Sequence, residues 1–192
     1  STDGISAMNN DNDEDDPYKN NSLTANYSYE ISDNNTIENS LRVTDSFLKY
    51  DSPSNSQDDL KPQTDDIEAH YNFKFNNINN NFKNTFGFSK SGTSREVTAA
   101  SGKENDFVGS KDIYSYLGEY NFNLDNKIIY GTDVEFLRAK FDHERAGNKF
   151  KLTSGAEIYS QYIDYQFRPY ENIHATIGGR NDKHTSAGDE QS

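Results

Sequence analysis

The most constraining feature of this sequence is an alternation of apolar and polar residues with a period of two. In its first occurrence the apolar residues are Leu23, Ala25, Tyr27, Tyr29 and Ile31. The polar residues between them are Thr24, Asn26, Ser28 and Glu30. Because successive side chains of a β-strand point to opposite sides, this segment is predicted to be a strand with one apolar and one polar face.

The alternation recurs, and each pair of alternating segments is joined by turn-forming residues. The first pair turns at Ser32-Asp33-Asn34-Asn35, after which the apolar row continues. The apolar residues of that returning row are Ile37, Leu41, Val43 and Phe47. Similar pairs turn at residues 77–80, 123–126 and 168–172, so the short turns recur about every 45 residues. The pattern predicts a meander of about eight strands.

Polar segments separate the predicted hairpins, at residues 51–65, 90–110 and 140–149. We expect these to be long loops at the end of the strands opposite the short turns. Strands of about ten residues, joined alternately by short turns and long loops, with aromatic residues near the turns, are typical of outer-membrane barrels. The predicted fold class is therefore all-β, an antiparallel transmembrane β-barrel segment.

Composition supports this interpretation only when the two strand faces are considered separately. Of the 192 residues, 31% are hydrophobic and 27% are charged, a balance that by itself favours disorder. However, 13 Tyr and 12 Phe are too many for a solvated tail, because such large rings need to be covered. A membrane barrel resolves the conflict, since half of each strand faces water inside the barrel and the loops are polar.

Several functional classes are excluded. The formal net charge of −13 argues against a nucleic-acid partner. Cys is absent, so the chain has no thiolate nucleophile or disulfide, and no apolar stretch is long enough for a membrane helix. The N-terminal residues carry no export signal, so we expect either a protein that is not exported or an internal piece of a longer precursor.

No catalytic constellation is present in the sequence either. The histidines lie on separate predicted strands and loops, without a closely spaced ligand pair. They are His70, His143, His174 and His184. No nucleophile elbow, phosphate loop or dinucleotide fingerprint occurs. We therefore expect no enzymatic activity, no required cofactor and no chemistry at the histidines.

The acidic run at residues 9–16 contains the candidate metal ligands Asp11, Asp13 and Asp15. Closely spaced carboxylates suit Ca²⁺, but this run lacks the Gly and the distal Glu of an EF-hand loop. The favoured interpretation is a solvated extracellular loop, with calcium as the alternative.

Two segments resemble TonB-dependent outer-membrane receptors, with the cobalamin-receptor-like branch as the nearest match. The opening segment resembles the entry to an early barrel strand of this family. It comprises Asp3-Gly4-Ile5-Ser6-Ala7 followed by Asp15-Asp16-Pro17-Tyr18-Lys19-Asn20. At the end, residues 178–188 resemble the family's strand-end pattern of Gly, any residue, Arg, an acidic run, His-Ser and a Gly-containing loop. Lys183, Thr185 and Ala187 depart from that pattern.

The resemblance implies a barrel of about 22 strands, closed by an N-terminal plug, in the outer membrane of a Gram-negative bacterium. It implies uptake of a scarce nutrient such as cobalamin, an iron-siderophore or haem, driven by TonB through the plug. It also implies calcium held by Asp residues in a comparable loop. Residues 1–192 would then be a partial β-barrel domain embedded in lipid, lacking the plug, the TonB box and the remaining strands, with two open edges prone to aggregation.

Two alternatives remain open at this stage. One is a complete small barrel of about eight strands, which we expect less because the chain ends in Asp189-Glu190-Gln191-Ser192 and not on an aromatic strand residue. The other is a soluble, calcium-binding extracellular β-domain of adhesin type, for which the acidic run is the positive evidence.

Overall fold

The computed structural model describes residues 18–49, 63–99, 102–145 and 148–186. Within these ranges the chain forms eight strands and no helix that is long and apolar enough to cross a membrane. The strands are β1 Tyr18–Ser32, β2 Asn35–Lys49, β3 Gln63–Asn79, β4 Phe82–Ala99, β5 Gly102–Asn123, β6 Asn126–Arg145, β7 Asn148–Tyr170 and β8 Ile173–Ser186.

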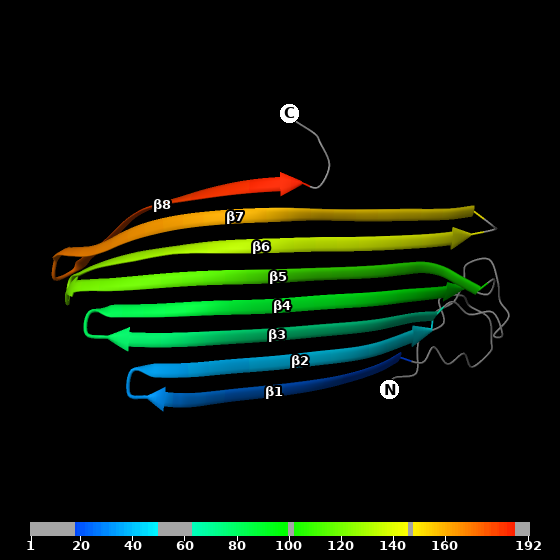
Figure 1. The fold of residues 1–192 in the computed structure, drawn as a ribbon, viewed down its shortest axis with the longest axis horizontal. Coiled ribbons are helices and arrows are strands. Elements are labelled where there is room, and N and C mark those ends of the chain that lie inside the picture. Colours follow the sequence, from blue (N-terminus) through cyan, green and yellow to red (C-terminus); the bar gives the residue numbers. More distant parts are fainter. Residues whose placement is uncertain (1–17, 50–62, 100–101, 146–147, 187–192) are drawn as a thin grey trace.

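The strands form one antiparallel sheet in which each pairs with its neighbours in sequence, in the order β1 to β8. Figure 1 shows a single layer in which the four tight turns lie at one end of the sheet and the strand ends away from these turns lie at the opposite end. We call these the turn end and the connection end. The expected meander is therefore confirmed, and β1 and β8 form the two edges of the sheet.

The tight turns occur where the polar turn residues predicted them. They lie at Asp33-Asn34, Asn80-Asn81, Leu124-Asp125 and Glu171-Asn172. Asn80 has a φ of 48°, in the left-handed region that Asn tolerates better than most residues. In the third turn the Asn123 side-chain oxygen accepts a hydrogen bond of 2.9 Å from the backbone N–H of Asp125, an Asx-type contact that stabilises the reversal.

Successive hairpins are staggered along the sheet. The turn of one hairpin forms a backbone hydrogen bond with a residue shortly before the turn of the next hairpin. Ile78 N donates to Asn34 O at 2.8 Å, and Asn121 N donates to Asn81 O at 2.9 Å. A third such bond joins Arg168 N to Asp125 O at 2.9 Å. A regular displacement of this kind is the stagger expected of strands that are tilted relative to the axis of a barrel.

The expectation of long loops at residues 90–110 and 140–149 is wrong. Residues 90–99 continue β4 and residues 102–110 begin β5, while residues 140–145 and 148–149 belong to β6 and β7. The strands have 14 to 23 residues, not about ten. The prediction failed because polar residues occupy both faces of β4 and β5 in this region, so no apolar row marks them as strand. Of residues 51–65, the last three begin β3 and the others lie outside the described residues.

The sheet has an aromatic face and a polar face. The register places Ile37 opposite Phe75, Phe75 opposite Phe86, and Phe86 opposite Tyr116, so the apolar rows of consecutive strands share one side. The residues of opposite parity, such as Glu38, Lys74 and Ser115, share the other side. The paired rows predicted from the period-two pattern are thus confirmed.

This sheet has no hydrophobic core of its own. Among the described residues no hydrophobic side chain is buried, and the one fully buried side chain is that of Ser160. Large apolar side chains of the aromatic face are about half exposed, including Leu23 at 63%, Tyr114 at 52% and Ile163 at 53%. A single layer buries apolar surface only between side chains, so the aromatic face requires a covering that the described residues do not supply.

Candidate membrane surface and interior wall

Ring contacts run across the aromatic face from strand to strand. Ring centroids lie 4.4 Å apart for Phe82 and Tyr120, and 5.0 Å apart for both Phe86–Tyr116 and Phe88–Tyr114. Further contacts extend this ladder to β3, β6 and β7. Such cross-strand aromatic pairs stabilise the sheet and leave a broad apolar surface facing outward.

The apolar rows of this face have a similar length in most strands. They span residues 23–31, 67–75, 114–122, 128–136 and 159–167. Each covers about nine residues, or about 30 Å of extended strand. A strand tilted by about 40° would project this row onto a height of about 23 Å, close to the apolar band of about 25 Å in outer-membrane barrels.

Tyrosine hydroxyls within this band have polar partners from neighbouring strands. Tyr71, Tyr116 and Tyr165 donate to the side-chain oxygens of Asn39, Asn84 and Asn126 at 2.8, 2.9 and 2.7 Å. Their hydroxyl groups are therefore satisfied, while the rings add to the apolar surface.

Two tyrosine rings lie over glycines of the preceding strand. The ring of Tyr130 covers Gly118 on the aromatic face, and the ring of Tyr162 covers Gly131 on the polar face. A Cβ atom at Gly118 would lie 2.7 Å from the Tyr130 hydroxyl oxygen and closer still to the ring. The missing side chain is what allows each ring to pack flat against the neighbouring strand.

The polar face is linked by hydrogen bonds across β2, β3 and β4. Asn72 donates to Ser40 at 3.1 Å and accepts from Ser89 at 2.7 Å. Asn76 in the same way donates to Glu38 at 3.2 Å and accepts from Thr85 at 2.9 Å. Between β5 and β6, Lys111 forms an ion pair of 2.5 Å with Glu135. This face has the polar character of a barrel interior.

Arg180 organises the polar face between β7 and β8. Its guanidinium donates to Ser160 Oγ at 2.9 Å and to both carboxylate oxygens of Asp182 at 2.9 and 3.1 Å. It also lies 5.7 Å from the ring centre of Tyr162, a cation–π contact. The closing motif of the sequence thus forms most of β8, although its residues 187–188 lie outside the described residues.

In β6 and β7 the apolar residues change face at a common level. Up to Phe136 the apolar row of β6 lies on the aromatic face, but the next residues of that face are Arg138, Lys140 and Asp142. The polar face of β6 meanwhile becomes apolar, with Leu137, Ala139 and Phe141. Strand β7 changes at the same level, since Phe136 lies opposite Glu157, and the apolar row of β5 ends there too, since Asp112 also lies opposite Phe136.

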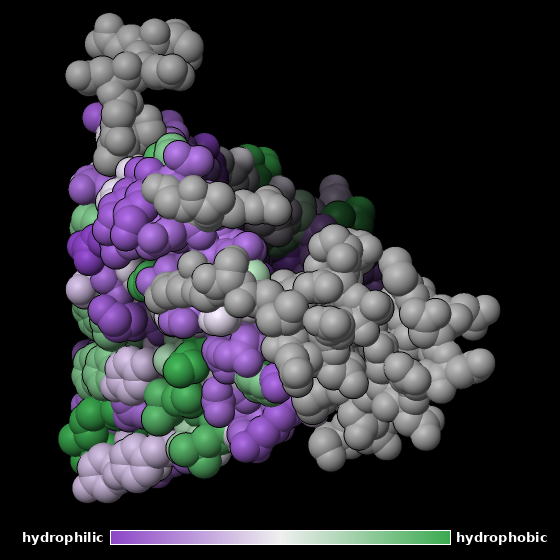
Figure 2. Space-filling view, turned by 90° about the vertical axis from the view of Figure 1, so that its right-hand side faces the viewer, coloured by the Kyte–Doolittle hydropathy of each residue, from purple (hydrophilic) through white to green (hydrophobic). Residues whose placement is uncertain are grey.

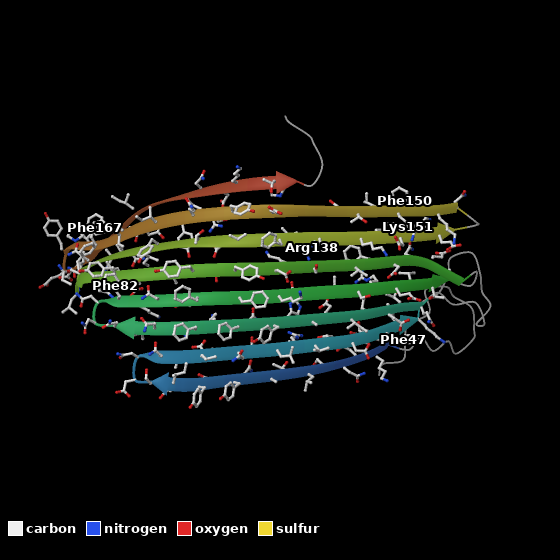
Figure 3. The ribbon with its side chains drawn as sticks, in the orientation of Figure 1. Phe47, Phe82, Arg138, Phe150, Lys151 and Phe167 are labelled. Carbon is white, nitrogen blue, oxygen red and sulfur yellow. The ribbon has the colours of Figure 1, made fainter. Side chains whose placement is uncertain are left out.

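The connection-end half of the aromatic face is therefore charged. Asp142 Oδ2 lies 2.9 Å from Lys140 Nζ and 3.6 Å from Lys151 Nζ. The hydrogen bond from Lys140 is the main cause that lowers the pKa of the Asp142 carboxyl, with the positive charge of Lys151 adding to it. Figure 3 shows Lys151 near the connection end and Arg138 midway along the sheet, while Phe82 and Phe167 lie at the turn end. Hydrophilic side chains predominate in the view from the connection end (Figure 2).

The polar face is hollowed at a site that includes the apolar side chains of Phe107, Leu137 and Ala139. Glu68 and His70 also line this hollow, whose volume is about 430 Å³. It lies toward the connection end, beyond the level at which the apolar residues change face.

The structure keeps the sequence-predicted site residues apart. His70 lies on β3, His143 on β6, and both His174 and His184 on β8, all on the polar face, and His143 Nδ1 is 2.6 Å from Asn105 Oδ1. Asp11, Asp13 and Asp15 lie outside the described residues. Within the described ranges no three His, Asp or Glu side chains are close enough to hold a metal ion. The sequence analysis did not predict the change of face. Its signal in the sequence is that apolar residues occupy both odd and even positions in residues 150–167.

These features together define the fold of an outer-membrane barrel wall, with eight meandering strands, an apolar outer band and a polar inner face. Comparison with solved structures supports that fold. The outer membrane transporter YddB from Escherichia coli matches with a TM-score of 0.69 and 13% identity over 87% of this chain. The chain spans 28% of the length of that transporter. No family model matches the sequence, and no curated protein is similar to it at a significant level.

Proposed function

We propose that this chain is part of the barrel of a TonB-dependent outer-membrane transporter that takes up a scarce nutrient. The observation that carries the proposal is the aromatic band, because an exposed band of this height and composition is suited to lipid and to no aqueous setting. The likeness in fold to an outer membrane transporter is consistent with it.

The strands extend well beyond the apolar band at the connection end. In β5, residues 102–113 lie beyond it, which is about 40 Å of strand. A barrel with a wall of this length encloses a vestibule above the membrane, where a ligand can be captured before passage. We assign the connection end to the cell exterior and the turn end to the periplasm, because short turns are typical of the periplasmic side.

The nutrient is proposed to be cobalamin, an iron-siderophore or haem, with energy supplied by TonB through a plug encoded elsewhere in the protein. Ligand-binding residues of such a protein would lie on the plug and the outer loops. In this proposal the described strands form the wall that encloses the ligand, and none of their residues performs a chemical step.

The test begins with the native protein. An antibody against residues 51–65, used on membrane fractions of the source cells, should detect an outer-membrane band at about three times the mass of this chain. A band in the outer membrane near 21.8 kDa would instead indicate a complete small barrel. A soluble band at that mass, with calcium-dependent thermal stability in plain buffer, would support the adhesin-type domain.

Transport is tested by deleting the gene and measuring uptake of radiolabelled cobalamin, ferric siderophores and haem. Loss of one of these uptakes, reproduced by deletion of TonB and restored by the gene on a plasmid, is the expected result. Normal uptake of all three compounds in the deletion strain would exclude each of them as the nutrient transported by this protein.

A further inference from the structure

A groove crosses the polar face within the hollow described above, at right angles to the strands. Its floor is a row of small residues that lie opposite one another on four neighbouring strands, Thr93, Gly109, Ala139 and Ser154. Larger side chains border this floor, with Phe107 toward the connection end and Leu137 toward the turn end. We call this feature the transverse groove.

Both borders of the transverse groove present apolar groups to it. The Phe107 ring leans over the floor, since a Cβ atom at Gly109 would lie 3.3 Å from two atoms of that ring. On the other border Leu137 lies opposite Ala156, which also lines the hollow. The volume of about 430 Å³ is in the range of small-molecule sites, and an aromatic ring beside a flat apolar floor suits a flat apolar ligand.

Ionisable side chains lie at the margin of the transverse groove. On the polar face those that line the hollow are Glu68, His70 and Lys111. His70 Nε2 lies 4.0 Å from Glu68 Oε2, and Lys111 forms its ion pair with Glu135. The floor itself consists of small uncharged residues. An occupant that matches the groove should therefore have an apolar centre and carry its charged groups at an edge.

The transverse groove lies beyond the apolar band of the aromatic face. Ala139 in its floor is about 10 Å of strand beyond Phe136, the last residue of the apolar row in β6. In the barrel proposed above, this position is on the inner wall of the vestibule. A nutrient that enters from the cell exterior would pass the groove before it reaches the membrane-spanning part of the barrel.

We propose that the transverse groove is a contact site for the nutrient and that this nutrient is of the haem class. The inference rests on the proposed function, since it requires that the polar face lines the inside of an outer-membrane barrel. Haem has a flat, largely apolar ring with its carboxylates at one edge. Amide groups surround the ring of cobalamin, and siderophores carry polar chelating groups, so neither would cover Phe107 and Leu137 with an equally apolar surface. The haem ring lies over Gly109 and Ala139, and its carboxylates point to the polar margin.

The test uses the full-length protein in lipid nanodiscs, with empty nanodiscs as the blank. Its affinity is measured by fluorescence for metal-free protoporphyrin and for uroporphyrin, which has the same ring but carries a carboxylate on every side chain. Protoporphyrin should bind at least about tenfold more tightly, because additional carboxylates are costly to bury in an apolar groove. Leu137→Gln should weaken protoporphyrin binding about fivefold, because it removes apolar contact and places an amide under the ring. In cells, deletion of the gene should abolish uptake of haem.

The matched control is Leu152→Gln, the same change at an exposed leucine of the same face that lies opposite Phe141 and does not line the hollow. It should alter the affinity for protoporphyrin less than about twofold. Heat-modifiable migration of both variants checks that they fold. Equal affinities for the two porphyrins, unchanged binding by Leu137→Gln, or an equal loss in both variants would each overturn the proposal. If deletion abolishes uptake of cobalamin or a ferric siderophore but not of haem, this inference alone fails; if the wild type is not in the outer membrane, the proposed function fails with it.

Discussion

At the scale of single residues, the sheet depends on glycines that make room for tyrosine rings. Gly118 and Gly131 each lie under a ring from the following strand. Gly179 is different, because a Cβ atom there would have no neighbour within 4 Å. The role of a glycine in this chain is therefore decided by its cross-strand partner, which neither composition nor local sequence shows.

Substituting Gly118 by Ala should destabilise the protein. The added methyl group overlaps the Tyr130 ring, and overpacking of this kind costs about 1–3 kcal/mol. Gly179→Ala on the same face should be neutral or stabilising by about 0.5 kcal/mol, because Ala restricts the unfolded chain. The denaturation temperature of the full-length protein in detergent measures both, and a lower value for Gly179→Ala than for Gly118→Ala would contradict the packing argument.

Asp142 should make the connection end of β6 and β7 sensitive to acid. Its pKa is lowered from 3.8 by Lys140 and then Lys151, so the folded state favours the carboxylate. The resulting stabilisation is present above its ordinary pKa and is lost as the pH falls through the lowered value. Hydrogen exchange of residues 137–158, corrected for the intrinsic rate, should show protection falling below about pH 4. Asp142→Asn should remove this pH dependence, and an unchanged profile in the variant would assign it to other groups.

At the scale of strands, the period-two pattern predicted the turns, the hairpins and the pairing of apolar rows. It worked in residues 67–75 and 114–122 because one face there is consistently apolar. It failed beyond those rows, because Lys90 and Asp112 occupy the outward side and Ser91 and Lys111 the inward side. Hydrogen bonding between strands, which needs no apolar row, extends the sheet there. Sequence periodicity therefore reported the part of each strand that carries an apolar row and not the full length of the strand.

The two faces should respond oppositely to a charge introduced at neighbouring positions of β1. Ala25 lies in the apolar row, and Asn26 lies on the polar face. Ala25→Arg should cost about 2 kcal/mol, since an arginine on the lipid face is costly near the middle of the bilayer, whereas Asn26→Arg should cost less than about 0.5 kcal/mol. Both are compared by the amount of heat-modifiable protein in the outer membrane. A greater loss for Asn26→Arg would mean that the faces are assigned the wrong way round.

At the scale of the whole molecule, one layer of strands with two free edges and no buried hydrophobic side chain among its described residues is not a self-sufficient domain. Lipid can cover the aromatic face, and further strands can pair with the edges of β1 and β8 to close a barrel. A stable fold thus requires partners outside these strands, which is why the class of fold follows from the sequence but the identity of those partners does not.

The level at which the apolar residues change face should mark the edge of the membrane, and cysteine labelling can locate it because the chain contains no Cys. In intact cells a membrane-impermeant maleimide should label Thr153→Cys, which lies outward beyond the apolar row of β7. Ile163→Cys, on the same strand and face but within that row, should react at least about tenfold more slowly, because a thiol in the hydrocarbon region is shielded from water and does not ionise. Both variants should label equally after denaturation, which controls for expression. Fast labelling at both positions would show that the aromatic face meets water, and the membrane assignment of this face would then have to be abandoned.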